Sequence, residues 1–349
     1  MPPVILFFLI TSLTIGTSIV FSSSHWLLAW IGLEINSLAI IPIMTRTHNP
    51  RATEAVTKYF LTQAAASATI LFATLINATH TGEWGLQCLT DSFSILIITT
   101  ALCFKLGLAP MHVWMPEVYQ GVDLLTAMLL ATWQKLAPFS IIMQLNPGSS
   151  NFLFFMGMLS VLIGGLGGLS QNQMRKILAY SSISHMGWMI IILQYQPQLT
   201  LLALLTYLVM TFSMFMVLHI TDATDMNRLA MSWAKMPVIT ALTPLILLSL
   251  GGLPPLTGFL PKWLILAELA KQGLGAMATI VALTTLLSLY FYLRLGYAIF
   301  ITISMNTNLG TTTWRQKATK MLLPLAASTM MTLASLPLAP SLLALLTIT

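Results

Sequence analysis

Residues 107–116 read Gly-Leu-Ala-Pro-Met-His-Val-Trp-Met-Pro, and residues 252–261 read Gly-Leu-Pro-Pro-Leu-Thr-Gly-Phe-Leu-Pro. Both follow the pattern Gly-Leu-x-Pro-x5-Pro and interrupt long apolar runs, and each has a lysine close by, Lys105 before the first and Lys262 after the second. Because proline lacks a backbone N–H and clashes with the preceding helical turn, each stretch is expected to break a helix. Broken membrane helices in both halves of a chain indicate a transport site.

The composition of the chain is that of a membrane protein. Of its 349 residues 57% are apolar and only 7% are charged, and the mean hydropathy is +0.86. A soluble domain carries about 25% charged residues, so the soluble classes are excluded. The net charge is +6, but the basic residues are scattered over short loops. This distribution argues against nucleic-acid binding. Cys88 and Cys103 are too few for a disulfide framework or a metal site.

Apolar runs of bilayer length follow one another along the chain. Since a spanning helix needs about 20 apolar residues, the sequence predicts an all-α polytopic membrane protein with about eleven transmembrane helices and no soluble domain. The first run, without basic residues, is expected to be a spanning helix rather than a cleaved signal or transit peptide. The predicted spans are 3–21, 25–44, 53–77, 91–110, 122–145, 151–170, 176–194, 198–220, 237–271, 275–303 and 321–345.

The basic residues of the loops decide how the long run 237–271 is interpreted. Lysine and arginine collect on the inner side of a membrane. If 237–271 crosses once, as one broken helix, all the basic loops lie on one side, whereas two crossings would divide them. A single crossing fits better and places the N-terminus inside and the C-terminus outside. These loops carry Arg46, Arg51, Arg175, Lys176, Arg228, Lys235, Arg315, Lys317 and Lys320.

Five ionisable side chains fall inside the predicted spans. Each costs about 2.5–3.5 kcal/mol at mid-bilayer on insertion scales, so each requires an explanation. Such groups either line a transport path or form a static ion pair that fixes helix packing, and both interpretations apply to Glu34 with Lys105. Snorkelling to the interface explains cations near span ends, namely Lys58, Lys271 and Arg294. The five are Glu34, Lys105, Lys135, His185 and Lys262.

Three histidines have structural interpretations as well. His185, in the middle of the seventh span, either passes protons or packs with a hydrogen bond to a serine such as Ser181. His112, in the first break, either joins the proton path or caps carbonyl groups that the break frees. His219 lies at a span end, where a structural role is expected.

A row of lysines and a histidine suits proton transfer. The pKa of lysine in water is about 10.4. Desolvation or a neighbouring positive charge lowers this pKa, whereas a nearby carboxylate raises it. A lysine beside a movable carboxylate can therefore be switched, and histidine passes protons near neutral pH. The sequence thus predicts a relay from Glu34 and Lys105 through Lys135 and His185 to Lys262, with water bridging the gaps.

Motifs for other kinds of chemistry are absent from the sequence. It contains no P-loop, no Cys-x-x-Cys, no haem motif and no zinc spacing. The glycine-rich residues 164–168 lie inside an apolar span with no strand before them, so we expect close helix packing there rather than a dinucleotide loop. The energy for transport must come from an ion gradient or from partner proteins.

Longer motifs resemble those of a known family. Residues 104–118, 252–263, 30–36 and 171–187 are similar to the antiporter-like membrane subunits of respiratory complex I. The resemblance covers essentially the whole chain. It implies a single transmembrane proton-translocation domain over 1–349, built from two inverted five-helix repeats and an extra helix. The repeats are expected at 1–145 and 151–303, the broken helices at 91–120 and 237–271, and the extra helix at 321–345.

The resemblance also assigns site residues. The acid of the family's ion pair falls on Glu34, its pair lysine on Lys105 and its next relay lysine on Lys135. The central histidine falls on His185 and the distal lysine on Lys262, and His112 is a further candidate. No metal, redox centre or other cofactor is implied for this chain, because NADH, FMN, iron–sulfur clusters and ubiquinone are bound by other subunits.

The implied function is proton translocation within NADH:ubiquinone oxidoreductase of the mitochondrial inner membrane, driven by quinone reduction in other subunits. The expected neighbours are subunits of the chain 4L and chain 4 types, with membrane lipids around them and no nucleic acid. The N-terminus would face the matrix and the C-terminus the intermembrane space. Two alternatives remain. A stand-alone cation/proton antiporter would work without NADH, and a structural scaffold would leave pumping intact when relay lysines are replaced.

Overall fold

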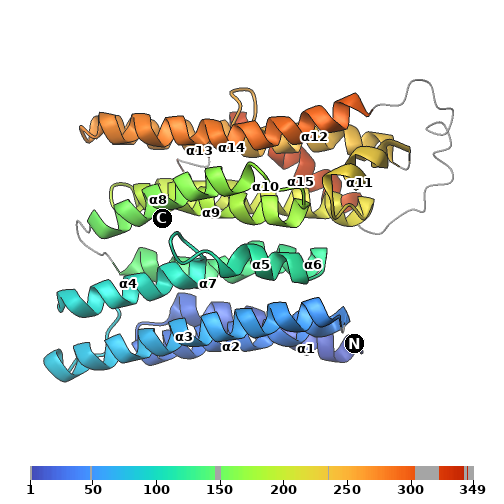
Figure 1. Cartoon of the computed structure of the whole chain (residues 1–349). Coiled ribbons are helices and arrows are strands. Elements are labelled where there is room, and N and C mark those ends of the chain that lie inside the picture. The colour runs from blue at the N-terminus through green and yellow to red at the C-terminus, as the bar shows by residue number, and fades with distance from the viewer. Residues whose placement is uncertain are drawn as a thin grey trace. The chain divides into compact units, whose positions relative to one another are not determined.

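The computed structural model describes residues 2–47, 49–145, 151–234, 236–302, 322–341 and 344. Over these residues the chain is helical and forms no strand beyond two isolated bridges, His25–Gly85 and Gln173–Asp225. The predicted all-α class is confirmed. The chain divides into two compact units, Met1–Met156 and Gly157–Thr349, whose helices are labelled in Figure 1.

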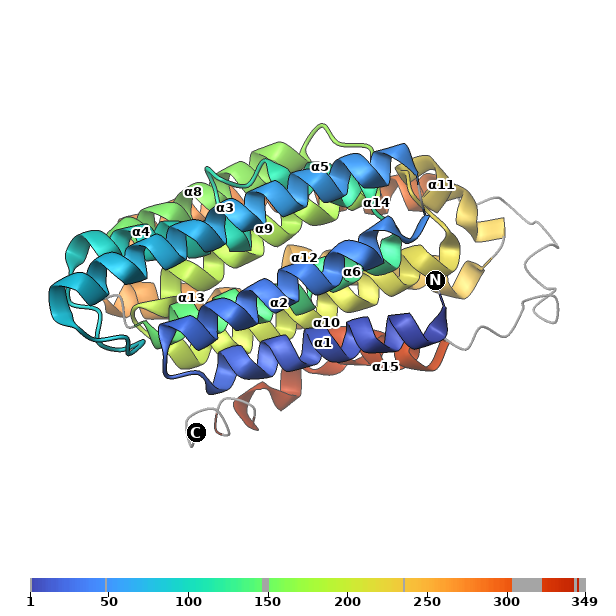
Figure 2. The ribbon, with the colours of Figure 1, turned by 90° about the horizontal axis from the view of Figure 1, so that it is seen from below.

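The first unit begins with three long helices, α1 (Pro3–Ser22), α2 (Trp26–Met44) and α3 (Pro50–Thr81), with a 3-10 turn at Thr45–Thr47. Helices α1 and α2 lie side by side (Figure 2). A methyl group at Gly32 would come within 2.9 Å of the Gly16 carbonyl oxygen. Small residues of this kind allow two membrane helices to approach closely.

The first break of the chain lies where the sequence predicts it. Helix α4 (Ser92–Leu106) ends, and the chain resumes as α5 (Trp114–Gly121). Gly107 adopts the left-handed conformation with φ 73° and ψ 39°. Its N–H donates to Phe104 O at 3.1 Å, and the next N–H, of Leu108, donates to Cys103 O at 2.9 Å. This is the Schellman ending, in which two otherwise unpaired carbonyl groups are satisfied by the backbone itself.

The second break repeats this geometry in the second unit. Helix α12 (Pro237–Gly251) ends at Gly252, with φ 80° and ψ 44°, and α13 (Phe259–Lys271) follows. The N–H groups of Gly252 and Leu253 again donate to the carbonyl groups three and five residues back, at 3.0 and 3.3 Å. Helices α4 and α12 have 15 residues each. Neither alone reaches the about 20 residues that a bilayer crossing needs.

The predicted span 122–145 is present as an apolar segment of 21 residues, but it is interrupted. Helix α6 (Leu124–Ala131) and helix α7 (Trp133–Gln144) meet at Thr132, whose φ is −108° and ψ −70°. The Thr132 hydroxyl donates to Met128 O at 2.8 Å, a bond that bends helices. Pro138, inside α7, gives no N–H to the turn before it. Together these residues weaken the helix just before Lys135.

Helix α9 (Met174–Leu193) forms the centre of the second unit. Within its apolar stretch, 83% of the residues are buried. Helices α10 (Pro197–Thr221) and α13 pack against it. At Gly164, in α8 (Asn151–Gly168), a methyl group would lie 2.7 Å from the backbone nitrogen of Ser184 on α9, so close packing of the glycine-rich stretch is confirmed. The remaining elements are α11 (Met226–Ala230), the 3-10 turns Met231–Ala234 and Leu336–Leu338, α14 (Gly275–Ile301) and α15 (Leu322–Ala334).

Helix α15 fastens onto the second break. The hydroxyl of Thr257, within the break, donates to Thr332 O at 2.6 Å. Thr332 belongs to the last turn of α15, where carbonyl groups have no partner in their own helix. The C-terminal helix is therefore tied to the irregular part of the broken segment.

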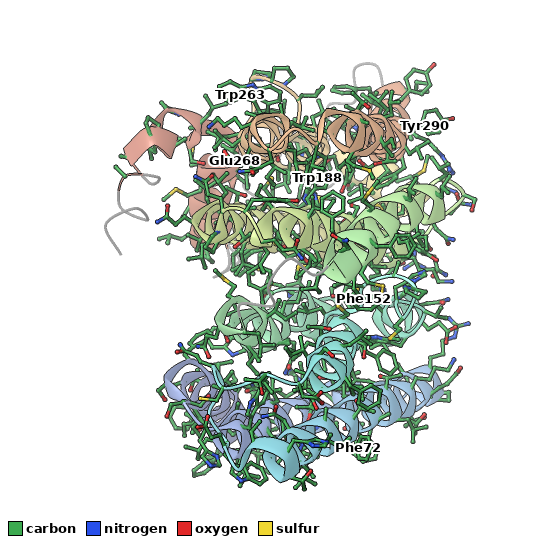
Figure 3. All side chains as sticks on the ribbon, turned by 90° about the vertical axis from the view of Figure 1, so that its left-hand side faces the viewer. Phe72, Phe152, Trp188, Trp263, Glu268 and Tyr290 are labelled. Carbon is green, nitrogen blue, oxygen red and sulfur yellow. The ribbon has the colours of Figure 1, made fainter. Side chains whose placement is uncertain are left out.

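Large apolar side chains point away from both units. Figure 3 shows Trp263 and Tyr290 projecting outward, whereas Trp188 lies among the helices. Trp263 is 57% exposed and Trp188 only 4%. Phe72 of the first unit also projects outward, with 56% exposed. Such extensive apolar exposure is foreign to monomeric soluble proteins and fits a lipid environment.

Eight helical segments of the described residues, the interrupted α6–α7 segment counted as one, are long and apolar enough to cross a membrane, and α4, α12 and α15 are shorter apolar helices. The predicted total of about eleven crossings and the inverted repeats stay predictions. The predicted span 321–345 is described only in part, because 321, 342–343 and 345 lie outside the described residues. Four of the loop cations lie outside them as well, namely Lys235, Arg315, Lys317 and Lys320.

Replacing Gly252 with alanine should destabilise the second break. An L residue in the left-handed region costs about 1–2 kcal/mol, and the new methyl group would meet the Lys262 side chain at 2.9 Å. The midpoint of thermal unfolding of the protein purified from its membrane should therefore fall. Gly252→Asn should lower it less, because asparagine tolerates this conformation. Gly275→Ala, where nothing lies within 4 Å, is the control, and an unchanged midpoint for Gly252→Ala would contradict the prediction.

Candidate functional site

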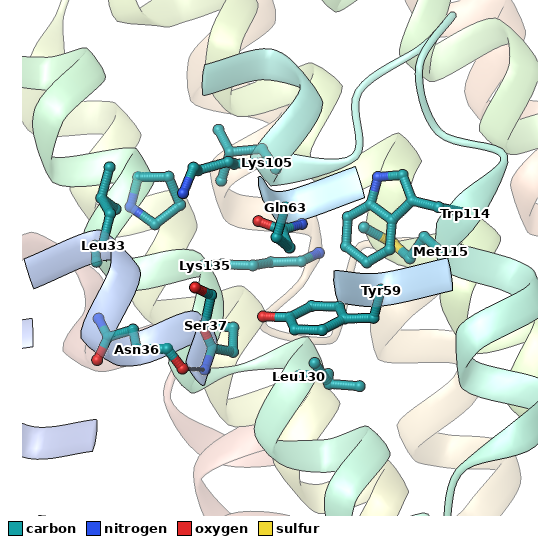
Figure 4. A pocket seen from close by; sticks show the side chains of 14 residues that line it. Leu33, Asn36, Ser37, Tyr59, Gln63, Lys105, Trp114, Met115, Leu130 and Lys135 are labelled. Atoms are coloured by element: carbon teal, nitrogen blue, oxygen red, sulfur yellow. Dashed lines mark hydrogen bonds between the residues drawn. The ribbon is translucent and has the colours of Figure 1, made fainter. Parts of the chain in front are cut away.

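Helices α2 to α7 of the first unit surround a small buried cavity, seen from close by in Figure 4. The centres of water-sized molecules can occupy about 20 Å³ of it. A single water requires about 10–15 Å³ by the same measure, so the cavity has room for one or two waters. It is lined by Leu33, Asn36, Ser37, Tyr59, Gln63, Lys105, Leu106, Trp114, Met115, Leu130, Gln134, Lys135, Ala137 and Pro138.

Two of the predicted relay lysines share this cavity. Lys105 lies in the last turn of α4 and is 7% exposed, and Lys135 lies in the first turn of α7 and is 3% exposed. Burying an ammonium group away from water is costly unless hydrogen bonds compensate. Two such groups around one small polar space repel each other when both are charged, so a proton held by one disfavours a proton on the other.

The expected ion pair between Glu34 and Lys105 is not closed in this structure. Among the described residues no ion pair within 4 Å joins them, and Glu34 Oε2 is buried without a hydrogen-bond partner there. Glu34 nevertheless lies next to the cavity, between the lining residues Leu33 and Ser37 of α2. Helices α2 and α4 each pack against α3 and α7.

Lys262 has a defined partner at the second break. Its Nζ donates to Gly251 O, the last carbonyl of α12, at 2.9 Å. The C-terminal end of a helix carries partial negative charge, so this position stabilises an ammonium group. At the first break a different carbonyl receives a side chain, because Trp114 Nε1 donates to Phe104 O, three residues before Gly107, at 3.2 Å.

The sequence register of the two breaks places Glu117 where the second has Lys262. Glu117 pairs with Lys58 of α3 at 2.8 Å, and Lys58 also pairs with Glu54 at 2.6 Å. In the helix after the other break, Glu268 pairs with Lys271 at 3.2 Å. The two breaks therefore share their backbone geometry but not their charges.

His185 is 9% exposed in the middle of α9, and its ring lies 5.6 Å from the ring of Tyr207 on α10. The Ser181 hydroxyl, one turn earlier, donates to Leu178 O at 2.8 Å. Helix α13, which carries Lys262, packs against α9. The second unit thus brings the helices of the two predicted distal relay residues into contact.

His112 lies within the first break and outside the cavity lining. Its Nδ1 is 3.2 Å from Pro110 O, a contact inside the break that fits capping of a freed carbonyl group. A part of His112 in the proton path stays a prediction.

Five uncharged polar side chains at the cavity were not predicted. They come from α2, α3 and α7 and stand beside the lysines, and two of them, on α3, are one turn apart in an apolar span. That spacing was the available signal in the sequence, since i and i+4 positions share a helix face. The five are Asn36, Ser37, Tyr59, Gln63 and Gln134. In the ranges that the structure describes, no three metal-binding side chains gather.

Comparison with known proteins places this arrangement in a family. The sequence model described as "NADH:quinone oxidoreductase/Mrp antiporter, TM" matches residues 23–288, and that described as "NADH dehydrogenase subunit 2 C-terminus" matches 289–343. The chain is 58% identical over 348 residues to NADH-ubiquinone oxidoreductase chain 2 of Carassius auratus, covering 99% of this chain and 100% of that one. The chain belongs to the NADH-ubiquinone oxidoreductase chain 2 family.

Other members and solved structures agree with this assignment. Chain 2 of Latimeria chalumnae is 54% identical over 347 residues, covering 99% of this chain and 100% of that one. A chain of respiratory complex I from Thermus thermophilus, solved with bound aureothin, is 30% identical with a TM-score of 0.86 and covers 97% of this chain and 79% of that one. A chain of the Mrp complex from Dietzia sp. is 17% identical with a TM-score of 0.81, covers 97% and 76%, and shows the shared fold alone.

In this chain 2 protein, replacing Trp114 with phenylalanine should destabilise the first break. Phenylalanine keeps an aromatic ring at this place but removes the indole N–H, which is the second donor to Phe104 O besides the Gly107 N–H, at a cost of about 1 kcal/mol. The thermal unfolding midpoint of the purified assembly should fall. Trp263→Phe, at an outward-facing tryptophan, is the matched control. Equal midpoints for the two variants would show that the indole bond contributes nothing.

Proposed function

We propose that this chain carries protons across the mitochondrial inner membrane as a core membrane subunit of NADH:ubiquinone oxidoreductase, by a relay of buried lysines and a histidine. Membership in the chain 2 family supports the place in the enzyme. The observation that carries the relay is the small cavity that Lys105 and Lys135 both line, with room for one or two waters. Water in such a space connects two groups that do not touch each other.

The first step of the proposed relay is a switch at Glu34. A carboxylate drawn close to Lys105 favours the ammonium form through Coulomb attraction, which is strong in a poorly solvated interior. When the carboxylate is apart, as in this structure, burial disfavours the charge on Lys105. Its proton then passes through water to Lys135, and repulsion between the two sites opposes its return.

The later steps pass the proton through His185 toward Lys262. Imidazole accepts a proton on one ring nitrogen and releases one from the other, so His185 suits the middle of a relay. Lys262, bonded to the end of α12, suits the distal position because the helix terminus stabilises a charge there. Each elementary charge moved against the membrane potential costs about 2.3 kcal/mol per 100 mV.

The energy for this work comes, in this proposal, from quinone reduction in other subunits. We propose that this chain binds no redox centre and no metal, and that NADH, FMN, iron–sulfur clusters and ubiquinone are bound by other subunits of the enzyme. The name of its relatives, NADH-ubiquinone oxidoreductase chain 2, supports the coupling to that reaction.

We assign neighbours and sidedness in the same way. Subunits of the chain 4L and chain 4 types flank this chain, and lipids cover the rest of its outward apolar surface. The N-terminus faces the matrix and the C-terminus the intermembrane space, a direction supported by the basic loop residues such as Arg46 and Arg51. Protease accessibility of tags at the two ends, in mitoplasts and in inverted vesicles, tests the direction.

Lys105→Met should leave the enzyme assembled and slow proton transfer through this chain by about 10²-fold, because methionine fills the space without holding a proton. The number of protons pumped per NADH oxidised, measured in vesicles with the reconstituted enzyme, should fall. Lys135→Met should do the same. Lys271→Met is the control, since Lys271 is exposed at a helix end and bound to Glu268.

The same experiment separates the alternative functions. A scaffold would keep a normal ratio of protons to NADH in Lys105→Met and Lys135→Met, and this result would overturn the relay. A stand-alone antiporter would exchange cations for protons in vesicles that contain only this chain, without NADH.

A further inference from the structure

Helix α3 contributes two buried polar side chains to the cavity that the relay so far leaves unused. Gln63 is 6% exposed and Tyr59 is 2% exposed, and both line the cavity. They stand one turn apart on the same face of α3. In Figure 4 Gln63 lies between Lys105 and Lys135, with Tyr59 below it.

These two polar groups find no protein partner. In the part of the chain that the structure describes, neither the Gln63 amide nor the Tyr59 hydroxyl forms a hydrogen bond with another residue. Polar groups buried to this degree are almost always hydrogen-bonded, to protein or to ordered water. A cavity of about 20 Å³ in front of them is large enough to supply that water.

The chemistry of an amide suits the space between two lysines. Its carbonyl oxygen accepts a hydrogen bond from an ammonium group or a water, and its NH₂ donates to a neutral amine or a water. Gln63 can therefore form hydrogen bonds with water in the cavity whichever lysine holds the proton. It does not titrate, so it orients the path without carrying the proton itself.

The position of these groups is fixed by the first break. The Tyr59 ring packs edge-on against the Trp114 ring, with 5.9 Å between centroids. Trp114 is the first residue of α5 and bonds to Phe104 O, the carbonyl just before Lys105. The polar face of α3 is thereby held in register with the end of α4.

We propose that Gln63 is a positioning residue of the proton path, which together with Tyr59 holds the water that joins Lys105 to Lys135. This inference rests on the proposed function, because it takes the two lysines to be successive proton carriers. It adds a group that governs the rate of the step between them.

The test compares Gln63→Leu and Gln63→Asn in the complete enzyme reconstituted in vesicles. Leucine has a similar size and no polar atoms, so proton transfer through this chain should slow about ten-fold, part of the about 10²-fold that a positioned proton donor contributes. Fewer protons should be pumped per NADH, and pumping should slow more in D₂O than in the wild-type enzyme. Gln63→Asn keeps the amide and leaves room for another water, so it should recover most of the ratio.

Ser67→Ala is the matched control. Ser67 lies one turn further along α3, is 4% exposed and donates its hydroxyl to Ala64 O at 2.9 Å, away from the cavity lining. Its replacement should change neither the ratio of protons to NADH nor the isotope effect.

The outcomes separate this inference from the proposed function. A normal ratio in Gln63→Leu together with a lowered ratio in Lys105→Met overturns the role of Gln63 alone, and a normal ratio in both overturns the relay. If Gln63→Leu does not assemble, a high-resolution structure of the native enzyme decides. Ordered water at the Gln63 amide supports the proposal, and a cavity without water there overturns it.

Discussion

The hydrogen-bonding demand of the backbone governs this structure, because a lipid interior offers no water to unpaired N–H and C=O groups. Both breaks meet that demand with a glycine in the left-handed conformation and two backbone bonds that turn back on the helix. One carbonyl near each end then receives a side chain, from Trp114 at the first break and from Lys262 at the second. Irregular backbone is thus tolerated at both places because polar side chains accompany it, together with space for water at the first break.

The same demand brings the chemistry to the breaks. Where a helix stops, its neighbours cannot pack as a continuous apolar surface, and the gap beside α4 and α5 is the cavity of the two lysines. Most of the polar groups that line it are uncharged. The space therefore suits transient protonation better than a permanent ion pair. The open state of Glu34 relative to Lys105 fits this view, because a closed pair would hold the proton in place.

Much of the fold could be predicted from local sequence. Proline and glycine act on the backbone within a few residues, so the two Gly-Leu-x-Pro-x5-Pro stretches identified both breaks, and apolar length identified the long helices. The interruption before Lys135 had local causes too, Thr132 and Pro138, but each is tolerated in many membrane helices and predicts no break alone. The count of crossings depends on a bilayer that the amino-acid chain does not contain.

The candidate site was only partly predictable, since it depends on how separate helices are rotated against each other. Charges inside a span are costly wherever they point, so their positions alone singled out the lysines. A glutamine or tyrosine costs far less, and only the packing of α3 against α4 and α5 shows that Gln63 faces the cavity. Lys262 carries a different lesson. Its Nζ both caps the last carbonyl of α12 and can hold a proton. A hydrogen bond from a charged donor is about twice as strong as one from a neutral donor. The hydrogen bond from Lys262 to the end of α12 therefore weakens when Lys262 loses its proton. At this break, the protonation of Lys262 is coupled to the position of the helix end.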